Sequence, residues 1–155
     1  MHIRIKCSTK AGSLFYNYKF FFSTVLQGVA DSESRFIFID LGAYGKQSDC
    51  GTFSASTVYH FLEGSEFTLP KPASFDGSGT EVPVFILGDK AYPLKRSLMK
   101  PFTRKDLSAE ERVDNYRLSR ARRCVVCAFG TLTAKRRLLN KAIETNVNKA
   151  ERTAR

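Results

Sequence analysis

The sequence predicts an α/β fold in which a mixed sheet is flanked by helices. Runs of β-branched and aromatic residues are concentrated in the first 89 residues, whereas apolar residues after position 107 recur at helical spacing. The 155 residues, 43% hydrophobic and 26% charged, are typical of a globular chain with room for one domain and a modest core. Strands followed by helices favour a sheet with helices packed against it.

The first half of the chain contains most of the predicted strands. Residues 1–6 alternate polar and apolar side chains, as a strand does. Residues 23–30 and 35–41 are rich in β-branched and aromatic side chains and are separated by a polar turn, which predicts a β-hairpin. We expect residues 42–49 to form a loop that leads to a short helix over residues 56–62.

The second half begins with a long connection and ends in helices. Prolines and glycines between residues 70 and 79 predict an exposed connection, and residues 82–87 predict a buried strand that stops before Asp89. Ser108 followed by Glu111 predicts a helix that starts with a capping box. After it we expect a polar helical tail over residues 141–155, preceded by a core-facing helical stripe of Val113, Tyr116, Leu118, Ala121, Val125, Ala128, Phe129, Leu132 and Leu138.

The positive charge of the chain lies in its last third. Residues 1–94 hold 8 basic and 9 acidic side chains (net −1), whereas residues 95–155 hold 17 and 6 (net +11). A basic segment of this size attracts polyanions, of which nucleic acid is the commonest, although a solvated helical surface has the same composition. The candidate DNA-binding residues are Arg117, Arg120, Arg122, Arg123, Lys135, Arg136 and Arg137.

Membrane and secretory functions are not favoured. The apolar stretches are far shorter than the roughly 18 residues that a membrane-spanning helix needs, and the first residues lack the apolar core of a signal peptide. Four cysteines at irregular spacings favour an intracellular, reduced protein. We expect no membrane partner.

Three aspartates follow predicted strands. Asp40, Asp49 and Asp89 each stand at or just beyond the end of an apolar run. Strand ends in an open α/β sheet are where sites form, and converging carboxylates would hold Mg²⁺ for phosphodiester cleavage. The alternative is that these aspartates serve turns and helix caps.

The remaining cysteine and histidine patterns carry little chemistry. Cys124 and Cys127 have the spacing of a zinc or redox pair, but no second pair completes a zinc site, so we expect both side chains in the core-facing stripe of a helix. His60 has no acid or serine motif near it and is assigned no role.

Several ordered blocks together resemble the nuclease domain of Harbinger-type (PIF/Harbinger) DDE transposases over approximately residues 2–150. The blocks are Phe15-Tyr16-Asn17-Tyr18-Lys19, Asp40 to Asp49 (DLGAYGKQSD), Leu87 to Leu94 (LGDKAYPL), Asn115 to Arg123 (NYRLSRARR) and Ala128-Phe129-Gly130. The resemblance implies an RNase H-like fold, a site for Mg²⁺ or Mn²⁺ made of acidic residues, and DNA strand cleavage and joining as the ancestral activity. It also implies nuclear localisation and a separate DNA-binding accessory protein.

The same resemblance implies an incomplete site. Asp49 and Asp89 match two of the family's aspartates and would be catalytic metal ligands. The family's first aspartate belongs to an Asp-Gly-x-His block whose histidine corresponds to His2, so it would precede Met1. Val126 stands at the position of the family's glutamate, and no acidic residue occurs between Asp114 and Glu144. Residues 1–155 therefore resemble part of a nuclease domain, incomplete at both ends, with little or no nuclease activity.

Three hypotheses follow from the sequence. The chain is a transposase-derived nuclease domain that binds metal weakly without turnover, a DNA- or chromatin-binding protein that uses its basic last third, or a fragment that does not fold stably because its sheet lacks an element.

Overall fold

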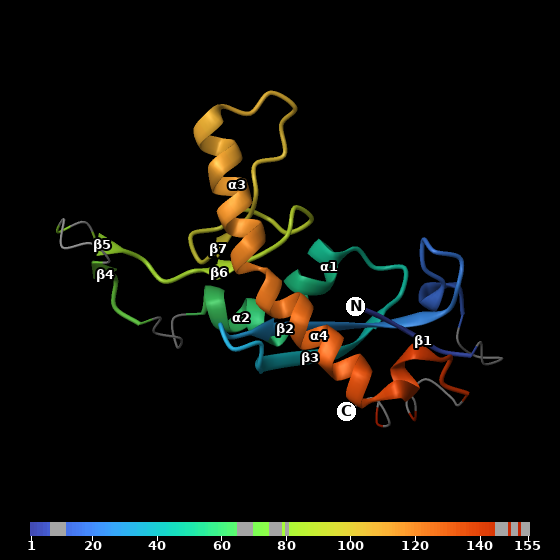
Figure 1. The fold of residues 1–155 in the computed structure, drawn as a ribbon. Helices are drawn as coiled ribbons and strands as arrows, with labels where there is room; N and C mark the ends of the chain where they lie inside the picture. The colour runs from blue at the N-terminus through green and yellow to red at the C-terminus, as the bar shows by residue number, and fades with distance from the viewer. Residues whose placement is uncertain are drawn as a thin grey trace. The chain divides into compact units, whose positions relative to one another are not determined.

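A computed structural model describes residues 1–6, 12–64, 70–74, 79, 81–144, 149 and 152. The chain divides into two compact units, one formed by Met1–Ser56 with Arg123–Arg155 and the other by Thr57–Arg122. The expected α/β class is confirmed, because both units combine helices with strands (Figure 1). No helix within the described ranges is long and apolar enough to cross a membrane.

The first unit is built on a three-stranded antiparallel sheet. Its strands β1 (His2–Arg4), β2 (Ser23–Ala30) and β3 (Phe36–Tyr44) lie in the order β1-β2-β3. The predicted hairpin is confirmed, and Asp31 closes its turn by accepting hydrogen bonds from the backbone N–H groups of Glu33 and Arg35 at 3.0 and 2.9 Å. A short 3₁₀ helix, η1 (Ser13–Phe15), lies in the chain between β1 and β2.

The apolar core of this unit lies on one face of the sheet. Alternate strand residues Ile3, Leu26 and Leu41 are buried there and form one cluster with Leu139 and Ile143. The covering elements are α4 (Arg123–Lys135) and the 3₁₀ helix η2 (Arg137–Asn140). Removal of these side chains from water supplies the main force that holds helix and sheet together.

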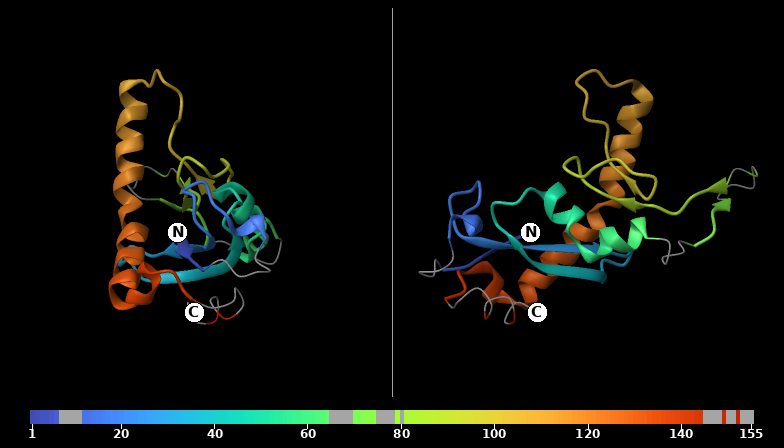
Figure 2. Two further views of the ribbon diagram at one scale, coloured as in Figure 1. Left: turned by 90° about the vertical axis from the view of Figure 1, so that its right-hand side faces the viewer. Right: turned by 180° about the vertical axis from the view of Figure 1, so that it is seen from behind.

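The opposite face of the sheet is associated with a helix that the sequence did not predict. Helix α1 (Asp49–Ser54) begins where a loop was expected, and the Ser48 hydroxyl caps it by accepting from the Gly51 N–H at 3.1 Å. Figure 2 shows α1 and η2 on opposite sides of the sheet. The strand β3 also extends to Tyr44, into the same predicted loop.

The second unit contains helices and two-residue strands joined by long connections. The short helix α2 (Thr57–Glu63) confirms the helix predicted over residues 56–62. Lys95 contacts it through an ion pair with Glu63 at 3.2 Å and a hydrogen bond to the Tyr59 hydroxyl at 3.0 Å. Helix α3 (Ala109–Ala121) starts with the predicted capping box of Ser108 and Glu111.

The buried strand predicted over residues 82–87 is wrong. The structure has two-residue strands instead: β4 (Ala73–Ser74) pairs with β5 (Glu81–Val82), and β6 (Ile86–Leu87) pairs in parallel with β7 (Leu98–Met99). Residues 83–85 lie between them outside any strand, with Pro83 among them. Because proline has no N–H to donate to a ladder, it interrupts the run.

The predicted helical stripe is only partly confirmed. Leu118 and Ala128 are buried, but Val113 is exposed and Tyr116 is 65% exposed. The expected core position of the two helix cysteines is wrong for Cys127, which is exposed, while Cys124 is half-buried and its thiol lies 3.4 Å from the Ser32 carbonyl oxygen. Helical spacing marks a face, but tertiary packing decides how much of that face is covered.

The segment from residue 141 onward is partly described. Ile143 is buried and forms a parallel bridge with Ile5, so this part of the predicted tail packs against the end of β1. The helical prediction for residues 145–148, 150, 151 and 153–155 lies outside the described residues.

Candidate functional site

The prediction that Asp40 stands at a strand end is wrong, because Asp40 lies in the middle of β3. Asp40 and the start of α1 at Asp49 nevertheless lie on the same side of the first unit's sheet. Asp40 pairs in register with Gln27, whose side chain therefore projects from the same face. The Gln27 Nε2 donates to the backbone carbonyl of Asp49 at 3.2 Å. Asp49 is the first residue of α1 and its side chain is exposed. Gln27 therefore links the start of α1 to the face that carries Asp40.

His2 projects from this face too and is held by a buried polar network. Its Nδ1 lies 3.0 Å from the Ser23 hydroxyl oxygen, which also accepts a hydrogen bond from Asn17 Nδ2 at 2.8 Å. Ser23 and Asn17 are both buried. Because Asn17 donates to the Ser23 oxygen, the Ser23 hydrogen is free to be donated to His2 Nδ1. The bond between Ser23 and His2 has the Ser23 hydroxyl or the His2 Nδ1–H as its donor, according to the imidazole tautomer.

The charges around His2 agree with a neutral ring. Burial lowers the pKa of His2 below its ordinary value, and the charged Met1 amino group and Lys19 lower it further, whereas Asp49 acts in the opposite direction. This face therefore carries the carboxylate of Asp40 and the imidazole of His2.

Gly45, the residue after β3, lies close to this network and to the backbone of Phe15. A Cβ atom at Gly45 would lie 2.5 Å from the Phe15 carbonyl oxygen and 2.6 Å from that of Ser23, closer than packed atoms approach. Only glycine fits between these two backbone segments. This glycine belongs to the block that ends at Asp49, so the motif has a packing role beside its candidate ligand.

Asp89 lies in the second unit and is engaged in a turn. Its Oδ1 accepts from the Ala91 N–H at 2.7 Å, and its backbone carbonyl accepts from the Tyr92 N–H at 3.2 Å. Its Oδ2 lies 4.0 Å from Arg122 Nη2. The structure thus gives Asp89 the turn-forming role that aspartates commonly have after strands. It also gives one candidate DNA-binding arginine an acidic partner.

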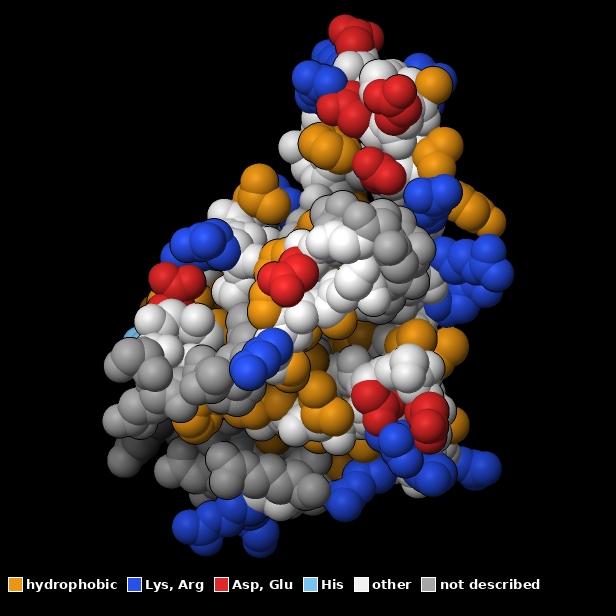
Figure 3. Space-filling model, turned by 90° about the vertical axis from the view of Figure 1, so that its left-hand side faces the viewer, with side chains coloured by type: hydrophobic (Ala, Val, Ile, Leu, Met, Phe, Trp, Pro, Cys, Tyr) orange, Lys and Arg blue, Asp and Glu red, His pale blue; other side chains and the backbone are white. Residues whose placement is uncertain are grey.

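The other candidate DNA-binding residues are exposed. Those on α3 are Arg117 and Arg120, and those beyond it are Arg123, Lys135, Arg136 and Arg137. Figure 3 shows acidic and basic side chains side by side around α3. The acidic residues of its first two turns therefore offset part of the basic charge of this helix.

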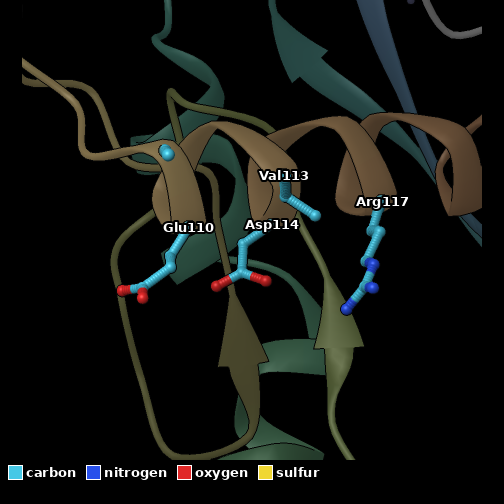
Figure 4. A pocket seen from close by; sticks show the side chains of 5 residues that line it. Glu110, Val113, Asp114 and Arg117 are labelled. Carbon is cyan, nitrogen blue, oxygen red and sulfur yellow. The ribbon is translucent and has the colours of Figure 1, made fainter.

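A shallow hollow of about 300 Å³ lies along one side of α3. It is lined by Ala109, Glu110, Val113, Asp114 and Arg117. Figure 4 shows that the four labelled side chains, three of them charged, project from the same side of the helix. Two carboxylates face one guanidinium there, so this side does not attract phosphate. The hollow does not add a nucleic-acid site.

The described residues do not form a closed metal site. No group of three or more histidine, cysteine, aspartate or glutamate side chains within the described ranges is placed to hold one metal ion. Asp49 and Asp89 belong to different units. Val126, at the expected glutamate position, lies on α4 and is 63% exposed. The donor set fits at most weak binding of a cation by single carboxylates, and we derive no metal-dependent step from it.

Sequence reasoning missed the network of Asn17, Ser23 and His2. These residues are distant in sequence from α1, and their contacts depend on the pairing of β1 with β2. The available signal is Asn17, a polar residue inside the aromatic string Phe15-Tyr16-Asn17-Tyr18-Lys19. A polar side chain between aromatic residues is a reasonable candidate for a buried hydrogen-bonded position.

Comparisons with known proteins place these residues in context. A family model described as DDE superfamily endonuclease matches residues 1–155. The Arabidopsis thaliana protein named "Protein ALP1-like" is 31% identical over 121 residues. That match covers 77% of this chain but 29% of the Arabidopsis protein, so the chain spans less than a third of its relative's length. No solved structure matches the chain.

Proposed function

Because the chain belongs to the DDE superfamily endonuclease family, we propose that it is part of a transposase-derived nuclease domain that contacts DNA but is impaired in strand cleavage. The resemblance to Harbinger-type transposases is confirmed at the level of the family. The observation that carries the impairment is Val126, an apolar side chain at the position of the family's glutamate. An RNase H-like topology and a nuclear location belong to the same proposal.

Asp49 and Asp89 are the metal ligands in this proposal. Both are carboxylates, the oxygen donors that Mg²⁺ and Mn²⁺ prefer, and both match aspartates of family motifs. A bound cation would polarise a phosphodiester and activate water. The role of this chain's own residues is to supply negative charge: Asp49 from an exposed helix start, and Asp89 from a turn where Arg122 competes for it.

The loss of the glutamate explains why turnover is not expected. A valine cannot ligate a cation, and no acidic side chain occurs on α4 to replace it. Two-metal phosphoryl chemistry needs both ions fixed in position, so a missing carboxylate removes charge compensation and geometry together. Weak binding of a cation by a single carboxylate is compatible with this donor set, whereas efficient cleavage is not.

The exposed basic side chains support contact with the DNA backbone. Arg120 and Arg123 are exposed, and Lys135, Arg136 and Arg137 form a consecutive exposed run. Lysine and arginine at such positions neutralise phosphates and give affinity that depends on salt rather than on base sequence. Specific targeting would then come from elsewhere, such as the separate DNA-binding accessory protein that the resemblance implies.

A second candidate function is a non-catalytic DNA- or chromatin-binding protein. The net charge of +11 in residues 95–155 favours it, because this charge does not depend on the acidic site. In this alternative, the fold is retained for its basic surface, and the aspartates serve turns and helix starts only.

Two titrations on the full chain test these proposals. We expect duplex DNA affinity to fall steeply with salt, and the triple variant R120Q/R122Q/R123Q to flatten the plot of log affinity against log salt by up to about three units of slope. Arg35→Gln, at the hairpin turn where Arg35 pairs with Asp31, is the matched control and should leave the slope unchanged. A salt-independent affinity would contradict both candidates.

Binding of Mn²⁺ separates the two candidates. The nuclease-derived proposal expects weak binding by calorimetry that Asp49→Ala and Asp89→Ala each reduce. The non-catalytic alternative expects no binding that depends on these two carboxylates, and DNA affinity that is unchanged by Asp49→Ala.

A further inference from the structure

The turn between Tyr16 and Phe22, here called the aromatic turn, exposes two aromatic rings. Tyr18 is 73% exposed and Phe20 is 81% exposed, with Lys19 between them. Large apolar rings are usually buried, and a pair of them on one short turn needs a reason. Packing of the described residues does not supply one, because neither ring belongs to the buried cluster and most of each side chain is exposed.

Hydrogen bonds hold the aromatic turn in one conformation. The buried Asn17 side chain accepts through Oδ1 from the Lys19 N–H at 2.9 Å and from the Phe21 N–H at 3.4 Å. The backbone adds bonds from Asn17 N to the Phe21 carbonyl and from Phe20 N to the Asn17 carbonyl, at 3.0 and 3.1 Å. A ligand that contacts the rings therefore meets a surface that is already ordered, which reduces the entropy lost on binding.

Phe20 has a strained backbone. Its φ is 62°, in the left-handed region that glycine adopts freely and that bulky side chains rarely occupy. Strain of this kind persists where the surrounding structure enforces it and is concentrated at functional sites. Phe20 therefore presents an exposed ring at a position where glycine would remove the backbone strain.

The aromatic turn lies beside the face that carries Asp49. The Tyr18 and His2 rings meet in an edge-to-face contact, with centroids 5.7 Å apart. His2 pairs with Val25, which shares a sheet face with Gln27, and Gln27 donates to the Asp49 carbonyl. Asn17 links the aromatic turn to His2, because its Oδ1 accepts hydrogen bonds within the turn and its Nδ2 donates to the Ser23 hydroxyl that contacts His2. The turn and the candidate site thus share one rigid support.

A cationic side chain lies against one of the two exposed rings, and a second cation lies against the neighbouring Phe21. Lys19 Nζ lies 5.6 Å from the centroid of the Tyr18 ring, and the Arg4 guanidinium lies 4.4 Å from that of Phe21. Exposed aromatic rings interleaved with cations are the arrangement that binds single-stranded nucleic acid: the rings stack on bases and the cations neutralise phosphates. Bases of a duplex are already stacked on one another, so their faces are closed to such rings.

We propose that the aromatic turn is a stacking site for unpaired bases of DNA, with Tyr18 and Phe20 as the platforms and Lys19 as the phosphate contact. The inference rests on the proposed function, because it requires that the DNA contacted by the domain passes over the sheet face next to Asp49. It assigns to this chain a preference for single-stranded DNA beside the candidate site, which the basic residues of the last third do not provide.

The test compares a single-stranded oligonucleotide of about 12 nucleotides with its duplex, each carrying 2-aminopurine, on the full chain. Stacking of an aromatic ring on 2-aminopurine quenches its fluorescence. We expect the single strand to be quenched on binding, and Tyr18→Ala to weaken its affinity by roughly 5- to 100-fold, the loss expected for one base stack, with little change for the duplex. Tyr18→Phe keeps the ring and should keep the affinity.

Phe20→Gly separates stacking from folding. The glycine relieves the positive φ, so the variant should melt at the same or a higher temperature while it loses single-strand affinity and quenching. Tyr116→Ala removes another exposed aromatic ring, on α3, and is the matched control that should change neither.

Two results would overturn the inference. One is unchanged quenching and single-strand affinity in both Tyr18→Ala and Phe20→Gly. The other is an equal loss for single strand and duplex, which would make these residues general backbone contacts. In either case, salt-dependent duplex binding that requires Arg120 and Arg123 would leave the proposed function standing, so the two failures are distinguishable.

Discussion

The Arg122 guanidinium lies 4.0 Å from the Asp89 carboxylate, so one candidate DNA contact neutralises one candidate metal ligand. Both side chains are half-buried, which limits rearrangement of the pair. A cation that approaches Asp89 must compete with a positive charge that is already in place. This pair offers a second reason, besides Val126, to expect weak metal binding by this chain.

Removal of that competitor should strengthen metal binding. In Arg122→Gln the positive charge beside Asp89 is gone, and we expect Mn²⁺ to bind up to about fivefold more tightly, as the small energy of a partly exposed ion pair allows. Calorimetric titration measures the affinity. Arg120→Gln, which removes an arginine from the same helix, should leave it unchanged, and equal effects of both variants would show that only net charge matters.

The pH dependence of stability should report on His2. Burial and the Met1 amino group lower the pKa of His2 below 6.5, so the folded chain holds a neutral imidazole while the unfolded chain takes up a proton first. The contribution of His2 to stability is therefore complete above pH 6.5 and is lost as the pH falls through 6.5 toward the lower folded pKa. Lys19 adds to this effect and Asp49 opposes it.

Thermal melts at a series of pH values check this sign. His2→Gln should flatten the fall in melting temperature just below pH 6.5. His60→Gln removes the other histidine, on α2, and serves as the control. A slope that is the same in the parent chain and in His2→Gln would show that His2 does not carry the dependence.

Local signals in the sequence predicted the local structure well. The hairpin of β2 and β3 and the capping box of α3 were found because each depends on residues a few positions apart. Helix α1 was missed because Gly51 and the preceding polar residues have the composition of a loop, and the helix depends on the Ser48 cap and on contacts of Thr52 and Phe53 with the rest of the unit.

Features that depend on distant contacts were not predictable. The exposure of Tyr116 and Cys127 could not be read from helical spacing, because spacing does not say which face a neighbour covers. The link from Asn17 through Ser23 to His2 depends on the pairing of β1 with β2. For the candidate site, the motifs located Asp49 and Asp89, but only the structure showed that Arg122 lies against Asp89.

The capping box should be worth a measurable part of the stability of α3. Ser108→Ala removes the acceptor for the Glu111 N–H, and we expect a loss of about 1 kcal/mol in the free energy of unfolding. Urea unfolding followed by helical circular dichroism gives this value. Ser119→Ala lies inside the same helix, and a loss as large as that of Ser108→Ala would argue against a specific cap.

The core and the surface of the first unit should respond very differently to truncation. Leu26 is buried between β1 and β3 in the apolar cluster, and Leu26→Ala should cost about 2–5 kcal/mol of unfolding free energy. Val126 is exposed on α4, and Val126→Ala should cost less than about 0.5 kcal/mol. A cooperative melt of the parent chain, lost in Leu26→Ala, would also rule out the hypothesis of an unstable fragment.

The central claim is that this chain keeps the scaffold of a DDE nuclease domain without its cleavage activity, and nicking of supercoiled plasmid tests it most directly. The full chain is incubated with plasmid and Mg²⁺ or Mn²⁺, beside an Asp89→Ala variant and metal alone. We expect the parent chain to nick no faster than metal alone, because Val126 leaves the site without a carboxylate that fixes the metal ions. Robust cleavage by the parent chain that disappears in Asp89→Ala would contradict the claim.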